Sequence, residues 1–177
     1  AYTFNTMGLV SDDDTTKQLF VQFCKRLRDE MGIKFQLVDP LTERRDGAGV
    51  LVLFPGQRFG MPLSGKLSRV HFLGATRDEL PSGTPVLAFS VENKGDSDWR
   101  SKKQLFRFGD HLGAYTGESS LRNGKLGWRG HSQTSSNAAL YVWSGDNSSS
   151  GTHASFFTLE NISTTPVAVI AVTAEYQ

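Results

Sequence analysis

Apolar residues near the start of the chain recur at spacings of three and four, as they do on one face of a helix. The stripe consists of Leu19, Phe20, Phe23, Cys24, Leu27 and Met31. Ser11 and the aspartates after it provide a capping hydroxyl and an acidic first turn, and Gly32 provides a stop. The pattern predicts an amphipathic helix over residues 11–31, with its apolar face packed on the rest of the fold.

From Ile33 onward, apolar and polar residues alternate, and this period of two indicates strands with one solvated face. Short apolar runs then follow one another to the end of the chain, with turn sequences such as Pro55-Gly56 and Asn123-Gly124 between them. The predicted strands are residues 33–37, 50–54, 67–73, 86–91, 104–108, 126–128, 140–143, 155–159 and 166–174. The pentapeptide GQRFG that begins at Gly56 is predicted to be a turn.

Many short strands, one helix and no βαβ pattern are typical of a β-sandwich or jelly roll. We therefore predict an all-β fold: an antiparallel jelly-roll β-sandwich of about eight or nine strands with one N-terminal amphipathic helix. A chain of 177 residues has the size of one domain. The expected organisation is a single jelly-roll domain over residues 1–177, with the helix in an N-terminal segment at 1–32 and the β-sandwich at 33–177.

Charge and composition narrow the classes of function. The 19 Lys and Arg residues nearly balance the 18 Asp and Glu residues, and no basic arm is present, so the electrostatic footprint of a dedicated nucleic-acid binder is missing. Cys24 is the single cysteine, which excludes an intrachain disulfide and suits a buried thiol in the helix. The longest apolar runs are far too short to span a bilayer as a helix, so we expect no membrane insertion.

The nearest candidate for a catalytic triad is His131, Ser132 and Asp146. Neighbouring residues on an extended strand point to opposite faces, so the His-Ser pair is poorly placed for a hydrogen bond unless the chain bulges. A G-x-S-x-G nucleophile elbow is also missing from the sequence. We expect no catalytic residue and no enzyme activity.

Metal chemistry requires clustered histidine, cysteine or carboxylate ligands. The four histidines, His71, His111, His131 and His153, are scattered at intervals of about 20 to 40 residues. Asp110-His111 offers two neighbouring side chains of the kind that bind metals, but such a dipeptide is more often a solvated pair in a loop. We expect no metal site and no cofactor.

Two stretches of the chain mix basic and aromatic side chains, a combination that can contact glycans or RNA. They supply a candidate ligand-contact surface of Trp99, Lys102, Lys103, Trp128 and Arg129. Solvated strand faces explain the same residues equally well, so the sequence leaves both interpretations open.

Two parts of the chain resemble a known family. The first is SGKLSRVHF from Ser64 onward followed, after a loop, by GTPVLAF from Gly83; the second is ASFFTLEN from Ala154 onward followed by PVAVIAVTA. These steps are similar to the jelly rolls of coat proteins from small icosahedral picorna-like RNA viruses, especially the single-jelly-roll subunits of the secovirid group. Gln177 and Ala1 also suit the cuts that release such proteins from a polyprotein.

The resemblance implies a structural capsid protein that assembles with sister subunits into an icosahedral viral shell enclosing RNA. The expected partners are other capsid subunits in a homo- or hetero-oligomeric shell, genomic RNA bound weakly or non-specifically, and a host receptor. The expected location is the virion, and the host cytoplasm during assembly. Function would then reside in the faces and edges of the fold.

Two other functions remain open. A glycan- or receptor-binding β-sandwich, including a protruding capsid domain, would use aromatic residues such as Trp99, Trp128 and Trp143. A hydrolase would use His131 and Ser132. Glycan binding by the isolated chain would favour the first function, and unchanged ester hydrolysis after Ser132→Ala would exclude the second.

Overall fold

Nine antiparallel strands form the part of the chain that the computed structural model describes, residues 51–93, 103–117, 119–130, 137–147 and 153–177. The strands are β1 (Leu51–Leu53), β2 (Arg58–Gly65), β3 (Leu67–Thr76), β4 (Pro85–Asn93), β5 (Gln104–Arg107), β6 (Lys125–Gly130), β7 (Ala138–Asp146), β8 (Ala154–Asn161) and β9 (Val167–Tyr176). No helix occurs within these residues, which confirms the all-β prediction for them. The predicted helix at 11–31 and the predicted strand at 33–37 lie outside the described residues, so both stay predictions.

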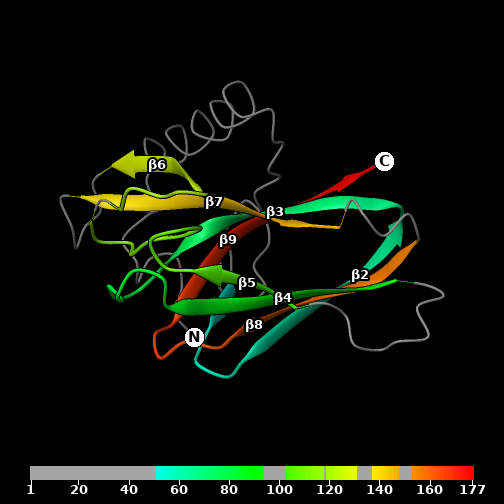
Figure 1. Cartoon of the computed structure of the whole chain (residues 1–177), viewed down its shortest axis with the longest axis horizontal. Coiled ribbons are helices and arrows are strands. Elements are labelled where there is room, and N and C mark those ends of the chain that lie inside the picture. The colour runs from blue at the N-terminus through cyan, green and yellow to red at the C-terminus, as the bar shows by residue number, and fades with distance from the viewer. Residues whose placement is uncertain (1–50, 94–102, 118, 131–136, 148–152) are drawn as a thin grey trace, which may run out of the picture.

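The strands form two sheets that lie over one another as two layers (Figure 1). The five-stranded sheet has the order β1-β9-β3-β7-β6, and the four-stranded sheet has the order β2-β8-β4-β5. Every ladder between neighbouring strands is antiparallel. This arrangement agrees with the predicted β-sandwich, in which each sheet turns one face toward the core.

Early and late strands pair in reverse order along the chain. β1 pairs with β9, β2 with β8, β3 with β7 and β4 with β5, so the chain pairs like a long hairpin folded back on itself. Further ladders between β3 and β9 and between β4 and β8 join these pairs within each sheet. β6 is added outside β7 at one edge of the five-stranded sheet. Because most partners are distant in sequence, the two halves of the chain depend on each other for their pairing.

Aromatic rings fill the space between the sheets. Phe72 of β3 stacks on Trp143 of β7 with ring centroids 5.8 Å apart, and it meets Phe89 of β4 edge-on at 5.6 Å. Phe106 of β5 and Phe157 of β8 complete the group, and all five side chains are at most 2% exposed. Aromatic pairs of this geometry stabilise a fold by about 0.5–1.5 kcal/mol beyond the burial of their area. The rings thus join the two layers into one core.

Eight of the predicted strands are confirmed, with ends that differ by a few residues. The predicted turn that begins at Gly56 is wrong in its second half, because β2 begins at Arg58. Only the first two residues of the pentapeptide belong to a turn. Gly56 adopts a φ of +79° there, and Gln57 N–H donates to the Phe54 carbonyl oxygen at 2.9 Å. β2 is an edge strand with mostly exposed side chains, including Pro62, so its sequence lacks the alternation of a half-buried strand.

Candidate functional site

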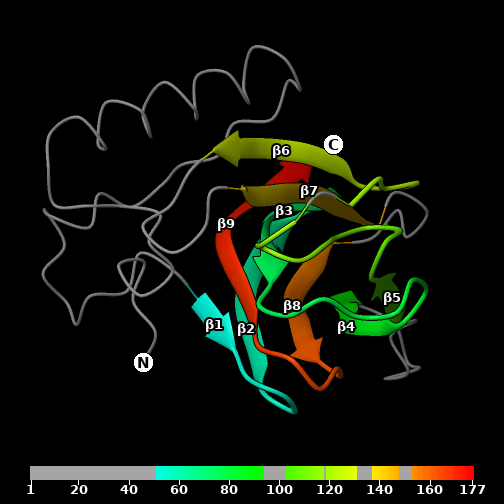
Figure 2. The same ribbon diagram turned by 90° about the vertical axis from the view of Figure 1, so that its left-hand side faces the viewer.

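Three loops meet at one end of the molecule, and we call this region the braced end. It comprises the β1–β2 turn at residues 54–57, the β3–β4 loop at 77–84 and the β8–β9 loop at 162–166. The β1–β2 turn and the β8–β9 loop lie at the same end in both views of the molecule (Figure 1 and Figure 2). Gly56 N–H donates to the Asn161 carbonyl oxygen at 2.8 Å, and Asn161 N–H donates to the Gln57 carbonyl oxygen at 2.9 Å. These main-chain bonds join the turn and the loop into one surface.

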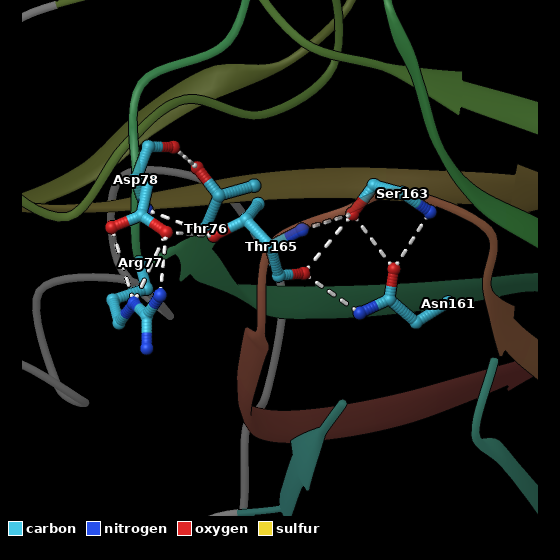
Figure 3. A network of polar contacts seen from close by, with 6 residues as sticks. All are labelled: Thr76, Arg77, Asp78, Asn161, Ser163 and Thr165. Carbon is cyan, nitrogen blue, oxygen red and sulfur yellow. Dashed lines mark hydrogen bonds and ion pairs between the residues drawn. The ribbon is translucent and has the colours of Figure 1, made fainter. Parts of the chain in front are cut away.

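Asn161, the last residue of β8, is the centre of a polar network inside the braced end (Figure 3). The residue is fully buried, with 0% exposure. Its amide nitrogen donates to the Leu53 carbonyl oxygen at 2.8 Å and to the Thr165 carbonyl oxygen at 2.9 Å, and its amide oxygen accepts from Ser163 N–H at 2.9 Å. Buried polar groups that lose such partners are destabilising because water does not replace them. One side chain thus connects β1, β8 and the β8–β9 loop.

Ser163 and Thr165 extend the network along the loop. The Ser163 hydroxyl oxygen lies 2.8 Å from Asn161 Oδ1 and 3.0 Å from the Thr165 carbonyl oxygen, so its proton can serve either acceptor. The Thr165 hydroxyl donates to Asp78 Oδ2 at 2.7 Å and accepts from Asp78 N–H at 3.2 Å. Both hydroxyl residues are buried. The network therefore crosses from the β8–β9 loop to the β3–β4 loop.

Asp78 joins this network to an ion pair. Its carboxylate accepts from Arg77 Nε at 3.1 Å and from Arg77 Nη2 at 2.9 Å, a bidentate arrangement. The hydrogen bonds from Arg77 and Thr165 stabilise the charged form and hold the pKa of Asp78 below its ordinary value. Arg77 N–H also donates to the Pro166 carbonyl oxygen at 2.9 Å. The side chains of Asp78, Asn161, Ser163 and Thr165 form hydrogen bonds within this network, and these bonds fix the shape of the β3–β4 and β8–β9 loops.

A second charged group lies on the outer face of the four-stranded sheet. Glu160 points away from the core because its neighbour Leu159 points into it. The carboxylate pairs with Arg58 Nη2 at 3.0 Å and with Lys103 Nζ at 3.2 Å. Burial disfavours the charged form, but the hydrogen bonds from Arg58 and Lys103 outweigh it and hold the pKa of Glu160 below its ordinary value. Both cations are largely exposed, so solvent screens these pairs and their contribution to stability is small.

On the five-stranded sheet, His71 of β3 lies in a hydrogen-bonded row with Ser144 and Glu175. Its Nδ1 is 2.7 Å from the Ser144 hydroxyl oxygen, and its Nε2 is 3.1 Å from Glu175 Oε2. The row has the order of groups found in a serine hydrolase, but hydrolysis also requires hydrogen-bond donors for the oxyanion. Ser144 lies on β7 directly opposite His71 of β3, and Glu175 lies on β9. The row therefore connects β3, β7 and β9 through their side chains.

Asp110 and His111, the dipeptide that the sequence marks as a fragment of a site, lie in the loop after β5. His111 Nδ1 accepts from Arg107 N–H at 3.2 Å and lies 3.3 Å from Asp110 Oδ2. Burial lowers the pKa of His111, and the Asp110 carboxylate opposes that shift. Asp110 also accepts from Asn123 Nδ2 at 2.8 Å. These contacts tie the loop to the segment that leads into β6.

Of the five candidate ligand-contact residues, the structure describes Lys103, Trp128 and Arg129. Trp99 and Lys102 lie outside the described residues. Lys103 precedes β5 of the four-stranded sheet, whereas Trp128 and Arg129 belong to β6 of the five-stranded sheet. The structure therefore does not bring Lys103 into one strand ladder with Trp128 and Arg129.

Trp143, a contact residue in the glycan-binding interpretation, is a core residue. It is 1% exposed and stacks on Phe72. Its expected role as a surface contact is wrong, because alternation along β7 places the indole between the sheets. Its Nε1 is the one buried side-chain polar atom in the described ranges without a hydrogen-bond partner.

The proposed triad cannot be assembled from the residues that the structure describes. His131 and Ser132 lie outside them, and Asp146 of β7 lies with Oδ1 3.7 Å from Arg69 Nε. Over the ranges that the structure covers, no group of three or more His, Cys, Asp or Glu residues could hold a metal ion. No helix in that part of the chain is both long and apolar enough to cross a membrane.

Sequence reasoning missed the polar network at the braced end. Asn161, Ser163 and Thr165 look like an ordinary turn between two strands, and such turn residues are usually exposed. The alternation of buried and outward-facing positions along β8 is the signal that could have revealed them. Phe157 and Leu159 mark every second position as buried, and the three polar residues continue that series.

Comparison of the chain with protein-family models and with curated proteins gives no match. The described residues offer three features that bear on function: strands paired in reverse order, the braced end, and side-chain rows that connect neighbouring strands.

Proposed function

We propose that the chain is a jelly-roll coat protein that assembles with sister subunits into an icosahedral viral shell enclosing RNA. The strand order carries the proposal. A jelly roll arises when a long antiparallel hairpin wraps into two four-stranded sheets. In such a hairpin the first strand pairs with the last, the second strand pairs with the one before the last, and so on toward the middle of the chain. The pairs β1–β9, β2–β8, β3–β7 and β4–β5 follow this rule, with β6 as an added edge strand. Viral capsid subunits are a common use of that architecture.

The braced end supports a role in assembly. Ordering a loop during binding costs free energy, so a loop that already has its bound shape gains affinity. Here Asn161, Ser163 and Thr165 hold the β8–β9 loop, and Asp78 connects it to the β3–β4 loop. Such a loop presents the same surface in every subunit, as repeated contacts in a shell require.

The sheet edges support the same role. Among the described strands, β1 and β6 end the five-stranded sheet, and β2 and β5 end the four-stranded sheet. Edge strands expose main-chain groups that promote unwanted pairing, and proteins interrupt or cover them. Pro62 interrupts β2, and neighbouring subunits in a shell would cover edges of this kind.

Glycan or receptor binding is the alternative function, because jelly rolls also serve as lectin domains. The observation that still favours glycan or receptor binding is in β6, where the half-buried Trp128 is next to the exposed Arg129. Trp143 no longer supports it. A glycan array probed with the isolated chain tests this alternative. Binding that Trp128→Ala abolishes and Arg58→Ala leaves intact would favour it over assembly.

Particle formation tests the shell proposal. The chain is co-expressed with the sister coat proteins of its polyprotein, and fractions are examined by sedimentation and electron microscopy. We expect closed particles that contain the chain. A strictly monomeric chain under all assembly conditions would count against the proposal.

A further inference from the structure

The tripeptide Asn161-Ile162-Ser163 has the sequence of a site for N-glycosylation, Asn-x-Ser with a residue other than proline in the middle. Sites of this kind normally lie in surface loops, because the attached oligosaccharide is bulky and needs solvent around it. Here Asn161 is 0% exposed and Ser163 is 9% exposed, whereas Ile162 between them is 42% exposed. The folded chain therefore hides the two residues that define the pattern.

The amide nitrogen of Asn161 also donates two hydrogen bonds. It donates to the Leu53 carbonyl oxygen at 2.8 Å and to the Thr165 carbonyl oxygen at 2.9 Å. The hydroxyl oxygen of Ser163 lies 2.8 Å from Asn161 Oδ1 and 3.0 Å from the Thr165 carbonyl oxygen. Figure 3 shows the Asn161 amide pointing toward Ser163 and Thr165. An enzyme that transfers an oligosaccharide thus has no access to Nδ2 in the folded chain.

Transfer of an oligosaccharide would change the Asn161 amide chemically. The bond between the first sugar and its lipid-linked pyrophosphate breaks, a bond from that sugar to Nδ2 forms, and Nδ2 releases one of its protons. The remaining proton can serve only one carbonyl oxygen, so either Leu53 or Thr165 loses this donor. The sugar would also need space beside a side chain that is fully buried in a close-packed region. The modified chain therefore cannot form the braced end.

Asn161 is open to transfer only before the chain folds. Its partner Leu53 lies 108 positions away in the sequence, so their hydrogen bond requires the long-range pairing of the strands. Contacts between such distant residues form late, because the intervening chain first has to be ordered. Until then the amide is as accessible as in any unfolded segment.

We infer that N-glycosylation of Asn161 and the native fold exclude each other, so that the chain has to fold in a compartment where no oligosaccharide is transferred to it. In the secretory pathway, folding and transfer would compete for the same amide. Each transferred oligosaccharide would then remove one molecule from the folded population. Shell formation is not required for this competition, because the amide is engaged within a single chain.

Secretion of the chain from eukaryotic cells behind a signal peptide tests the exclusion. Ser149→Ala is included to remove a second glycosylation pattern, Asn147-Ser148-Ser149. Limited proteolysis separates folded from unfolded molecules, and site-resolved mass spectrometry measures the occupancy of Asn161 in each fraction. We expect an occupancy at least about a hundredfold lower in the protease-resistant fraction, because a molecule that carries the sugar loses the hydrogen bonds and packing of the braced end.

Two further variants serve as controls. Lys125→Thr creates a glycosylation pattern at Asn123, which is exposed and donates to the Asp110 carboxylate near the surface. We expect its oligosaccharide to be present in the protease-resistant fraction. Phe72→Asp places a charge among the rings of the core and should prevent folding, so Asn161 should be occupied in that variant.

Three results would overturn the inference. The first is an occupied Asn161 in the protease-resistant fraction. The second is an unoccupied Asn161 in Phe72→Asp, because the tripeptide would then not serve as a glycosylation site even in the unfolded chain. The third is the absence of the Asn123 oligosaccharide from the protease-resistant fraction, because a general effect of secretion, rather than the burial of Asn161, would then separate the fractions.

Discussion

Asn161 occupies a position that the alternation of β8 assigns to the core, two residues after Leu159. An apolar residue would bury well there, but the Leu53 carbonyl group and the Ser163 N–H would lose the Asn161 amide as a partner, and the Thr165 carbonyl group would keep only the Ser163 hydroxyl. The asparagine amide offers two donors and an acceptor in one planar group, and it satisfies all three. At the residue scale, the shape of the braced end therefore depends on hydrogen-bonding chemistry more than on apolar volume.

Asn161→Ala should lower the free energy of unfolding by about 3–4 kcal/mol, because buried main-chain groups are left without partners. Asn123→Ala is the matched control, since Asn123 is exposed and its amide donates to the Asp110 carboxylate near the surface. We expect that control to change stability by less than about 1 kcal/mol. Urea denaturation measures both variants, and similar losses in the two would contradict the role assigned to Asn161.

Asp78 makes the same region sensitive to acid. Its folded-state pKa is lowered from an ordinary value of 3.8, first by Arg77 and then by Thr165. The stability that the charged form contributes is therefore fully present above that pH and is lost as the pH falls through the folded-state pKa. Thr165→Val removes the hydrogen bond to the Asp78 carboxylate and also the acceptor of Asp78 N–H. Only the first of these depends on the charge of Asp78, so the stability difference between wild type and variant should shrink in acid.

Chemical denaturation from about pH 3 to about pH 7 measures this difference. In the Asp78→Asn background, where no carboxylate remains to titrate, the effect of Thr165→Val should no longer vary with pH. A difference that grows as the pH falls would show that the Thr165 hydroxyl does not stabilise the charged Asp78.

At the scale of strands, the burial of a strand decides whether it can be predicted from the sequence. β3, β4, β7, β8 and β9 are predictable because core strands carry continuous or alternating apolar residues. β2 is not, because an exposed edge strand has no such pattern. The polar network is hidden for another reason: Asn161 contacts Leu53 across 108 positions of the chain, and Thr165 contacts Asp78 across 87. Local patterns predict elements, whereas the braced end arises from strand pairing.

β3 and β9 come into close contact at Gly74, next to a register shift in their ladder. A Cβ atom at this position would collide with the Ala168 carbonyl oxygen, which is main chain and cannot turn aside. Gly74→Ala should therefore lower the free energy of unfolding by about 3 kcal/mol or more. Gly56→Ala is the control, because Gly56 has a φ of +79° but no neighbouring atom, and only the left-handed conformation disfavours alanine there, by about 1–2 kcal/mol. Thermal denaturation ranks the two, and a larger loss in Gly56→Ala would contradict the close approach of β3 and β9.

In the whole molecule, strand pairing brings distant parts of the chain together, since β1 pairs with β9 and β2 with β8. The same pairing collects three loops at one end, where Asn161 and Asp78 connect them. The near balance of 19 basic and 18 acidic residues leaves shape and apolar contact, rather than a global field, to select partners. These properties would suit a subunit whose main partners are other subunits.

Recovery of the chain in RNA-containing particles is the most direct test of the proposed shell function. The chain is co-expressed with its sister coat proteins and a genomic RNA, treated with nuclease and sedimented through a density gradient. We expect the chain to sediment in closed particles together with nuclease-resistant RNA. A chain that stays at the top of the gradient as a monomer, with no protected RNA in any fraction, would contradict the shell function.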